Sequence, residues 1–182
     1  MRTVLLIVLL LFLVLAIAGN TWHIKNKPYN LRNKETALLK QLGDSALAHG
    51  DMPISAILLY DDKILASGYN DMFAHNNISG HAEINALESA TKRIGLDSFL
   101  KLDREKILLL TTWEPCDMCS GAIVQYNIRH VAVVKTKSLK HKWQQWKKKA
   151  HYKWNLQTAS PDTLQDYLFR KHPGYESQKN NL

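Results

Sequence analysis

The chain has 182 residues, of which 46% are hydrophobic, and this length suits one globular domain with a short extra segment. The chain has only two cysteines, Cys116 and Cys119, which is too few for a disulfide framework. Their Cys-x-x-Cys spacing is typical of metal binding or redox chemistry. The net charge of +8 favours anionic partners such as nucleic acid or acidic lipid, without selecting one of them.

The first segment is a strongly apolar run from Val4 to Ala18, and Gly19 to Trp22 could extend its helix. Together with its flanks this run approaches the ~20 residues of a membrane-spanning helix. Positive charges follow the run, and such charges stay on the cytoplasmic side: Lys25, Lys27, Arg32 and Lys34. We therefore expect residues 1–22 to be a single-pass membrane anchor, 23–30 a linker, and the domain 31–182 to be cytoplasmic. The alternative is a cleaved signal peptide followed by export, since Ala16-Ile17-Ala18 resembles a cleavage site.

The rest of the chain alternates helical and strand patterns. Hydrophobic periodicity and turn residues predict the following elements in chain order: a helix at 31–48, a β-hairpin of strands 54–60 and 64–69, a loop at 70–80, a helix at 81–93, a polar connection to residue 106, a buried strand at 107–112, a helix at 117–126 and a buried strand at 130–135. This order predicts an α/β fold in which helices cover both faces of one mixed sheet.

Two short motifs stand at the starts of predicted helices, His81-Ala82-Glu83 and Pro115-Cys116-Asp117-Met118-Cys119. One imidazole and two thiolates can hold a tetrahedral zinc ion whose fourth position is left for water. A carboxylate such as Glu83 beside that water can act as a general acid and base. Taken alone, the cysteines also fit a structural zinc knuckle or a redox pair, and an acidic residue in a first helical turn is common without any chemistry.

The order His-x-Glu, then Pro-Cys-x-x-Cys, is the signature of zinc-dependent nucleobase deaminases. From about Leu31 to Lys135 the chain resembles the cytidine/deoxycytidylate deaminase superfamily. The resemblance is strongest to the branch of tRNA adenosine deaminases and guanine deaminases, through "SGHAEINAL" (79–87) and "TTWEPCDMCSGAIVQYNIRHVAV" (111–133). It implies a three-layer α/β/α fold of the cytidine-deaminase type.

The same resemblance implies a role for each motif residue. It implies one Zn²⁺ per chain, held by His81, Cys116 and Cys119, and it makes Glu83 the proton carrier. Asn70 falls where the family has an asparagine that hydrogen-bonds the base, although an Asn can also simply end a strand. Peptide N–H groups near Ala82 and Cys116 are expected to orient the base or the reaction intermediate.

We therefore expect a hydrolytic deaminase that releases ammonia from an amino-bearing nucleobase, with a purine preferred (adenosine in tRNA, or guanine). The alternatives are cytidine or deoxycytidylate as substrate, and a non-catalytic zinc-containing binding module at a membrane or on RNA. Residues 77–80, "NISG", depart from the Asp-Pro-Thr-Ala usual in the tRNA enzymes, so the resemblance does not select a substrate. Expected partners are a nucleobase, nucleoside or tRNA, the membrane through the N-terminal helix, and a second copy in a homodimer.

The basic segment 135–154 contains eight lysines and two histidines. Its apolar residues recur at helical spacing, at Leu139, Trp143, Trp146, Ala150 and Trp154. Three interpretations predict this same stripe: a helix docked on the sheet by its tryptophans, a nucleic-acid surface, and a helix lying on acidic lipid.

Overall fold

The computed structural model describes residues 9–10, 29–154, 168 and 170–171, which belong to two units divided after Thr136. Within these described residues, no helix has the length and hydropathy needed to cross a bilayer. The expected anchor at 1–22 lies outside them, apart from Leu9 and Leu10, so the anchor remains a prediction.

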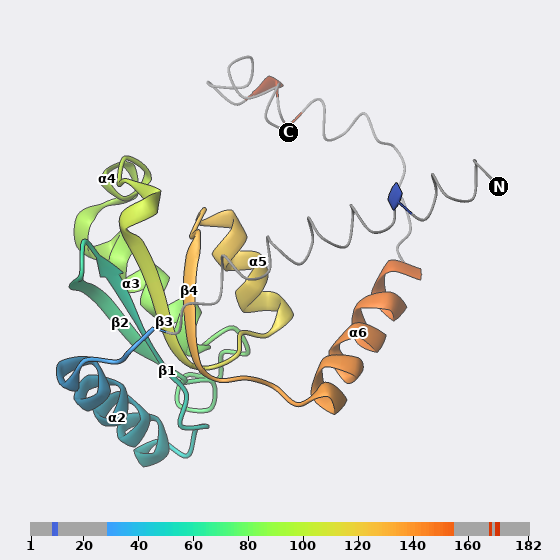
Figure 1. The fold of residues 1–182 in the computed structure, drawn as a ribbon, viewed down its shortest axis with the longest axis horizontal. Helices are drawn as coiled ribbons and strands as arrows, with labels where there is room; N and C mark the ends of the chain where they lie inside the picture. The colour runs from blue at the N-terminus through green and yellow to red at the C-terminus, as the bar shows by residue number, and fades with distance from the viewer. Residues whose placement is uncertain (1–8, 11–28, 155–167, 169, 172–182) are drawn as a thin grey trace. The chain divides into compact units, whose positions relative to one another are not determined.

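The described part of the first unit is built on a four-stranded mixed sheet in the order β2-β1-β3-β4 (Figure 1). β1 (Ser55–Tyr60) pairs antiparallel with both β2 (Lys63–Tyr69) and β3 (Ile107–Trp113). β3 pairs in parallel with β4 (His130–Lys135). Strands β2, β3 and β4 therefore run in the same direction, and their carboxyl ends meet at one edge of the sheet.

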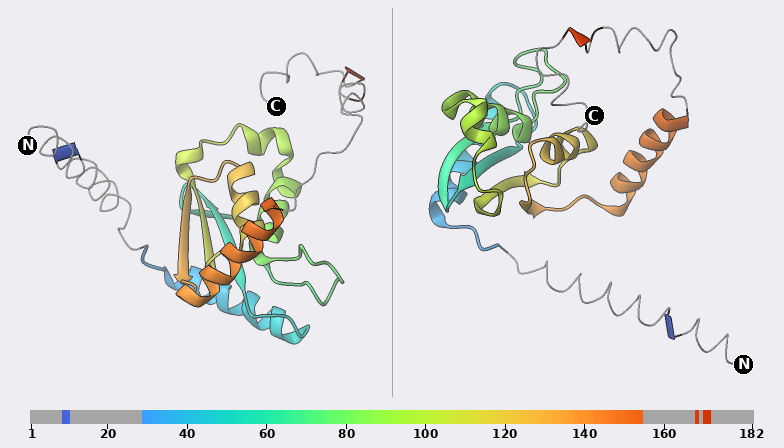
Figure 2. Two further views of the ribbon diagram at one scale, coloured as in Figure 1. Left: turned by 90° about the vertical axis from the view of Figure 1, so that its right-hand side faces the viewer. Right: turned by 90° about the horizontal axis from the view of Figure 1, so that it is seen from above.

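Helices cover both faces of this sheet, which confirms the three-layer arrangement (Figures 1 and 2). α2 (Asn33–Ala48) packs on one face, where Leu39 meets Ile57 and Leu59 of β1. α3 (Ala82–Ile94) and α5 (Asp117–Gln125) pack on the other face, against the alternate residues Ala56 and Leu58. Both sets are buried because successive strand side chains point to opposite faces.

The predicted β-hairpin is confirmed, but its turn has two residues, Asp61-Asp62, because Lys63, which was expected to lie in the turn, already belongs to β2. Both residues have positive φ, +49° and +61°, which is the conformation of a type I′ turn. This turn matches the right-handed twist of the flanking strands and so fixes their register, in which Tyr60 pairs with Lys63.

The expected polar connection between α3 and β3 is wrong in part, because it contains a short helix α4 (Leu96–Leu100) and a 3₁₀ turn, η1 (Arg104–Lys106). Phe99 of α4 is fully buried and meets Tyr126 edge-on, with ring centroids 5.7 Å apart. Arg104 donates hydrogen bonds to the carbonyls of Phe99 and Leu100, at the end of α4.

Gly68 of β2 lets α3 lie directly on the sheet. A Cβ atom at this position would come within 2.5 Å of the Ala86 nitrogen and 2.7 Å of the Ala82 oxygen, both in the backbone of α3. Only glycine therefore allows this approach. The contact fixes the first turn of α3, which follows His81, relative to the end of β2.

The second unit contains α6 (Leu139–Trp154), which confirms the predicted helix in the basic segment. Within it the indole rings of Trp143 and Trp146 stack, with centroids 5.0 Å apart and 18° between their planes.

Candidate metal centre

The two motif segments meet because two parallel strands end at the same edge of the sheet. β2 ends at Tyr69, and the loop 70–80 leads from it to His81, the N-cap of α3. β3 ends at Trp113, and Glu114-Pro115 lead to Cys116, the N-cap of α5. α3 and α5 pack side by side, so their N-termini converge, as ligand-binding loops do at the carboxyl ends of parallel strands.

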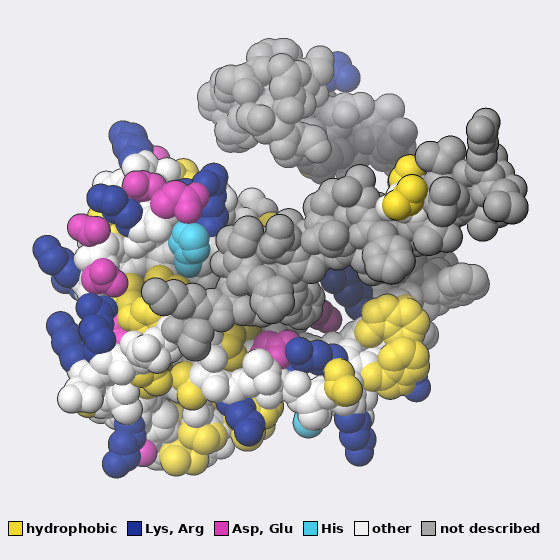
Figure 3. Space-filling view, viewed as in Figure 1, with side chains coloured by type: hydrophobic (Ala, Val, Ile, Leu, Met, Phe, Trp, Pro, Cys, Tyr) yellow, Lys and Arg dark blue, Asp and Glu magenta, His cyan; other side chains and the backbone are white. Residues whose placement is uncertain are grey.

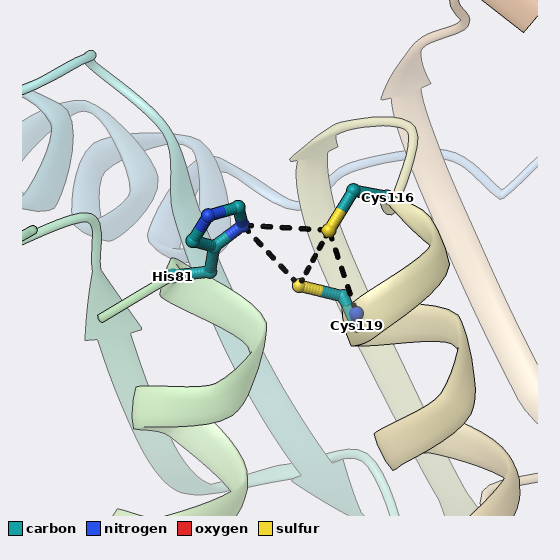
Figure 4. A group of neighbouring side chains, drawn as sticks. All are labelled: His81, Cys116 and Cys119. Atoms are coloured by element: carbon teal, nitrogen blue, oxygen red, sulfur yellow. Dashed lines mark hydrogen bonds between the residues drawn. The ribbon is translucent and has the colours of Figure 1, made fainter. Parts of the chain in front are cut away.

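The structure brings His81, Cys116 and Cys119 into one cluster (Figure 4). The Nδ1 atom of His81 lies 3.6 Å from Sγ of Cys116 and 3.5 Å from Sγ of Cys119. The two sulfur atoms are 3.6 Å apart. One nitrogen and two sulfurs thus form a nearly equilateral triangle.

These distances fit a tetrahedral zinc ion. Zinc bonds of about 2.3 Å to sulfur and about 2.0–2.1 Å to nitrogen, at tetrahedral angles, place two sulfurs about 3.8 Å apart and a sulfur and a nitrogen about 3.6 Å apart. The observed separations of 3.6, 3.6 and 3.5 Å agree with this within about 0.2 Å. The triangle has the size and the chemistry of three zinc ligands, with the fourth position left open.

Local electrostatics prepare the thiols for a cation. The contact between the two sulfurs, with a further contribution from His81, lowers the pKa of Cys116 to about 3 against the opposing effect of burial. The same interaction raises the pKa of Cys119, and burial and the Glu83 carboxylate raise it further. The Cys119 backbone N–H also points at Cys116 Sγ, 3.5 Å away. A divalent cation bound at this cluster would take both cysteines as thiolates and displace the remaining thiol proton.

Glu83 lies beside the cluster but is not one of its three ligands. It belongs to the first turn of α3, and its residue surface is only 3% exposed. Its Oε2 accepts from Cys119 Sγ at 3.4 Å, and its Oε1 accepts from the hydroxyl of Thr111 at 3.1 Å. Thr111 is a fully buried residue of β3 that the sequence did not single out. The carboxylate is thus held in a fixed orientation at the edge of the metal triangle.

Asn70 follows the last residue of β2, as predicted, and is buried. Its side-chain amide donates to Oδ1 of Asp51 at 3.2 Å. Asp51 is also buried, and its carboxylate accepts from the backbone N–H groups of Phe73 (2.9 Å) and Ala74 (3.1 Å). Asp51, which the sequence did not indicate, therefore orients Asn70 and holds the loop that follows it.

A second carboxylate, that of Asp71, closes the loop against α3. Oδ1 of Asp71 accepts from the side-chain amide of Asn85 at 2.8 Å, and the Asp71 N–H donates to the Gly80 carbonyl at 2.9 Å. A Cβ atom on Gly80 would come within 2.3 Å of Asp71 Oδ1. The Asp71 carboxylate thus fills the place of a side chain at position 80, the last residue of the unusual "NISG" stretch.

Ala82 lies between His81 and Glu83 and is the first residue of α3. Its side chain is fully buried among the core residues between α3 and the sheet. As the first residue of α3, it carries one of the N–H groups that hydrogen bonds within a helix leave unused. Any contact of Ala82 with a substrate would therefore be made by this N–H.

Among curated proteins, the tRNA-specific adenosine deaminase of Buchnera aphidicola subsp. Schizaphis graminum (strain Sg) is 35% identical over 83 residues, which are 46% of this chain and 52% of the relative. The guanine deaminase of Bacillus subtilis (strain 168) is 38% identical over 71 residues, 39% of this chain and 42% of the relative. The chain spans about half the length of the curated relatives it matches.

Among solved structures, one from a study of A-to-I editing by tRNA:A34 deaminases at the wobble position of transfer RNA is 28% identical, with a TM-score of 0.50. The match covers 58% of this chain and 76% of that one. The X-ray structure of guanine deaminase from Bacillus subtilis has a TM-score of 0.58 at 21% identity, covering 78% and 96% of the two chains, and so shares the fold.

The family model of the cytidine and deoxycytidylate deaminase zinc-binding region matches residues 32–135, which is more than half of the chain and includes His81, Cys116 and Cys119. By this match, and by a fold and a ligand triangle that agree with it, the chain belongs to the cytidine and deoxycytidylate deaminase zinc-binding family.

Proposed function

We propose that this protein is a zinc-dependent hydrolytic deaminase that releases ammonia from an amino-bearing nucleobase and prefers a purine. The observation that carries this proposal is the buried carboxylate of Glu83, 3.4 Å from a sulfur of the metal triangle and held there by Thr111. A purely structural zinc site has no use for a buried acidic group that is not a ligand.

The three ligands of the triangle would hold the ion, and each residue nearby has a task in the reaction. When bound, zinc supplies Lewis-acid activation of a water in its open fourth position. Glu83 accepts a proton from that water and passes it to the amino nitrogen of the base. A carbon–oxygen bond forms, the carbon–nitrogen bond breaks, and the nitrogen leaves as ammonia, so Glu83 ends the cycle as a carboxylate.

Asn70 is the residue proposed to bind the base. Its amide is fixed by Asp51 on one side, which leaves its oxygen for a donor group of the base. The Ala82 N–H at the start of α3 is the proposed second contact, because the N-terminus of a helix favours a developing negative charge.

The names of the relatives support a purine substrate. Those most similar in sequence include tRNA adenosine deaminases and a guanine deaminase, whose substrates both carry the amino group on a purine. Cytidine or deoxycytidylate is the competing choice, since the family model takes its name from enzymes of that class.

A non-catalytic binding module is the rival from another class, in which the zinc serves only the fold. The burial of the Glu83 carboxylate argues against it, because burying an acidic group costs free energy and a zinc site that serves only the fold gains nothing from a carboxylate that is not a ligand. We also propose that residues 1–22 anchor the chain in a membrane with the domain in the cytoplasm, because positive charges follow the apolar run.

The proposal is tested by ammonia release from the purified zinc-loaded chain. The substrates to compare are adenosine within a tRNA anticodon arm, guanine, cytidine and deoxycytidylate. We expect turnover on at least one of the two purines and none on the pyrimidines. Turnover on a pyrimidine alone would reject the purine preference, and no turnover on any of the four with zinc bound would favour the binding module.

A further inference from the structure

The helix α6 carries a basic surface that the deaminase chemistry does not use. Residues 139–154 include six lysines and no Asp or Glu. A surface with so many positive charges attracts an extended anionic partner. Figure 3 shows apolar side chains grouped on this segment with lysines at their border.

The apolar side chains of α6 form a narrow stripe between two rows of lysines. At about 100° per residue, Leu139, Trp143, Trp146 and Ala150 fall within an arc of roughly 60°. On the same geometry, Lys142 and Lys149 border one side of the stripe, and Lys140 and Lys147 border the other. This arrangement is symmetric about the stripe and suits a flat partner.

The tryptophans of this stripe are exposed and contact one another. Trp143 and Trp146 are 55% and 58% exposed, and Leu139 is 86% exposed. Their indole rings stack at 5.0 Å, and the ammonium of Lys147 lies 5.5 Å from the centre of the Trp143 ring. The two indoles thus cover one ring face of each other, and the pair as a whole presents an apolar surface.

The arrangement of the two indole rings favours acidic lipid over single-stranded RNA as the partner of α6. Unpaired bases bind tryptophan by stacking on an open ring face, and here each indole covers one face of the other while Lys147 lies against the Trp143 ring, which leaves fewer faces for a base. A bilayer interface needs no such face, because indole rings insert there as amphipathic groups while flanking lysines reach the acidic headgroups.

We propose that α6 is an interfacial helix that binds the surface of a membrane containing acidic phospholipid. Trp143, Trp146 and Leu139 enter the headgroup boundary, and the lysines on both sides of the stripe contact the phosphates and carboxylates of the lipid. Each lysine near such a surface contributes about fivefold to binding. The surface would act with the proposed N-terminal anchor but rests on different residues.

The experiment follows the fluorescence of Trp143 and Trp146 in the full chain. The chain is mixed with vesicles of brominated phosphatidylcholine, with or without brominated phosphatidylglycerol, because bromine in the acyl chains quenches inserted indoles. The variant Trp143→Phe/Trp146→Phe keeps the apolar stripe and supplies the background from the other tryptophans. The fluorescence of the wild-type chain minus that of this variant reports Trp143 and Trp146. We expect this difference signal to be quenched on the acidic vesicles, and most of the quenching to be lost on the neutral vesicles and in added salt.

Two lysine variants complete the test with equal changes in charge. Lys140→Gln/Lys142→Gln/Lys149→Gln should lose most of the quenching on acidic vesicles, while Lys34→Gln/Lys40→Gln/Lys101→Gln, on exposed positions of the first unit, should keep it. Equal quenching on neutral vesicles would overturn the proposal, as would no quenching on either. Weaker binding of a fluorescent single-stranded oligonucleotide by the α6 variant, without lipid quenching, would assign the surface to RNA instead.

Discussion

At the scale of single residues, two buried polar groups hydrogen-bond residues of the candidate site and hold them in place. Thr111 donates to the Glu83 carboxylate, and Asp51 accepts from Asn70. Thr111 is 28 residues from Glu83 in the sequence, and Asp51 is 19 residues from Asn70, so each hydrogen bond joins distant parts of the chain. Such partners orient the groups that act, so their removal should change kinetic constants while the metal stays bound.

We predict that Thr111→Val lowers kcat about tenfold while the chain retains its zinc. Valine fills the same volume but leaves Oε1 of Glu83 without this donor, and a tenfold effect corresponds to about 1.4 kcal/mol, the order of one hydrogen bond to a charged group. The neighbouring Thr112→Val is the control, because that hydroxyl bonds the Ser55 backbone instead. Steady-state kinetics with metal analysis decide, and an unchanged kcat in Thr111→Val would remove Thr111 from the account.

Asp51→Ala should raise KM about tenfold, because Asn70 loses the partner that orients its amide. The same change leaves the N–H groups of Phe73 and Ala74 without this acceptor, so the free energy of unfolding should also fall. A double-mutant cycle separates the two effects. In an Asn70→Ala background, Asp51→Ala should change KM much less, whereas an equal change in both backgrounds would show that Asp51 serves the loop alone.

At the scale of elements, the sequence predicted the parts whose patterns are long or carry clear turn residues. The hairpin, α3, β3, α5 and β4 all begin and end within about two residues of their expected bounds. α4 was missed because five residues are too few to show a repeating hydrophobic pattern, although the buried side chain of Phe99 makes this helix part of the core. The sequence predicted the motif residues because the two members of each motif lie close together in the chain, His81 with Glu83 and Cys116 with Cys119. Thr111 and Asp51 were not predicted, because their roles depend on contacts between elements.

Gly68 gives a prediction at this scale, since it lets α3 rest on β2. Gly68→Ala should lower the free energy of unfolding by about 1–3 kcal/mol, because the new Cβ meets backbone atoms of α3 that cannot move independently. Gly121→Ala in α5 is the matched control. Its added Cβ meets nothing within 4 Å, so it should be neutral or stabilise by up to about 1 kcal/mol. Denaturant unfolding measures both, and equal stabilities would contradict the close approach of α3.

At the scale of the whole molecule, the deaminase fold occupies the middle of the chain, and other features stand at its two ends. Residues 32–135 carry the family match, the apolar run precedes them, and the lysine-rich α6 follows. The family match explains the metal triangle but neither of these flanking features. Both features are proposed to interact with a membrane, which the family match does not indicate.

We predict that residues 1–22 remain on the mature protein with the domain in the cytoplasm, because Lys25, Lys27, Arg32 and Lys34 follow the apolar run. Intact-mass analysis should find the chain uncut, and protease added outside the cell should leave the domain intact. A mature N-terminus near Gly19 would instead identify a cleaved signal peptide.

The central claim is that Glu83 carries the proton at a zinc centre, and the variant Glu83→Gln tests it most directly. Its zinc content and its rate of ammonia release are measured beside those of Glu88→Gln, a more exposed position on the same helix. We expect about one zinc per chain in both variants, with turnover lowered by ~10²–10⁴-fold in Glu83→Gln alone. Wild-type turnover in zinc-loaded Glu83→Gln would contradict the account.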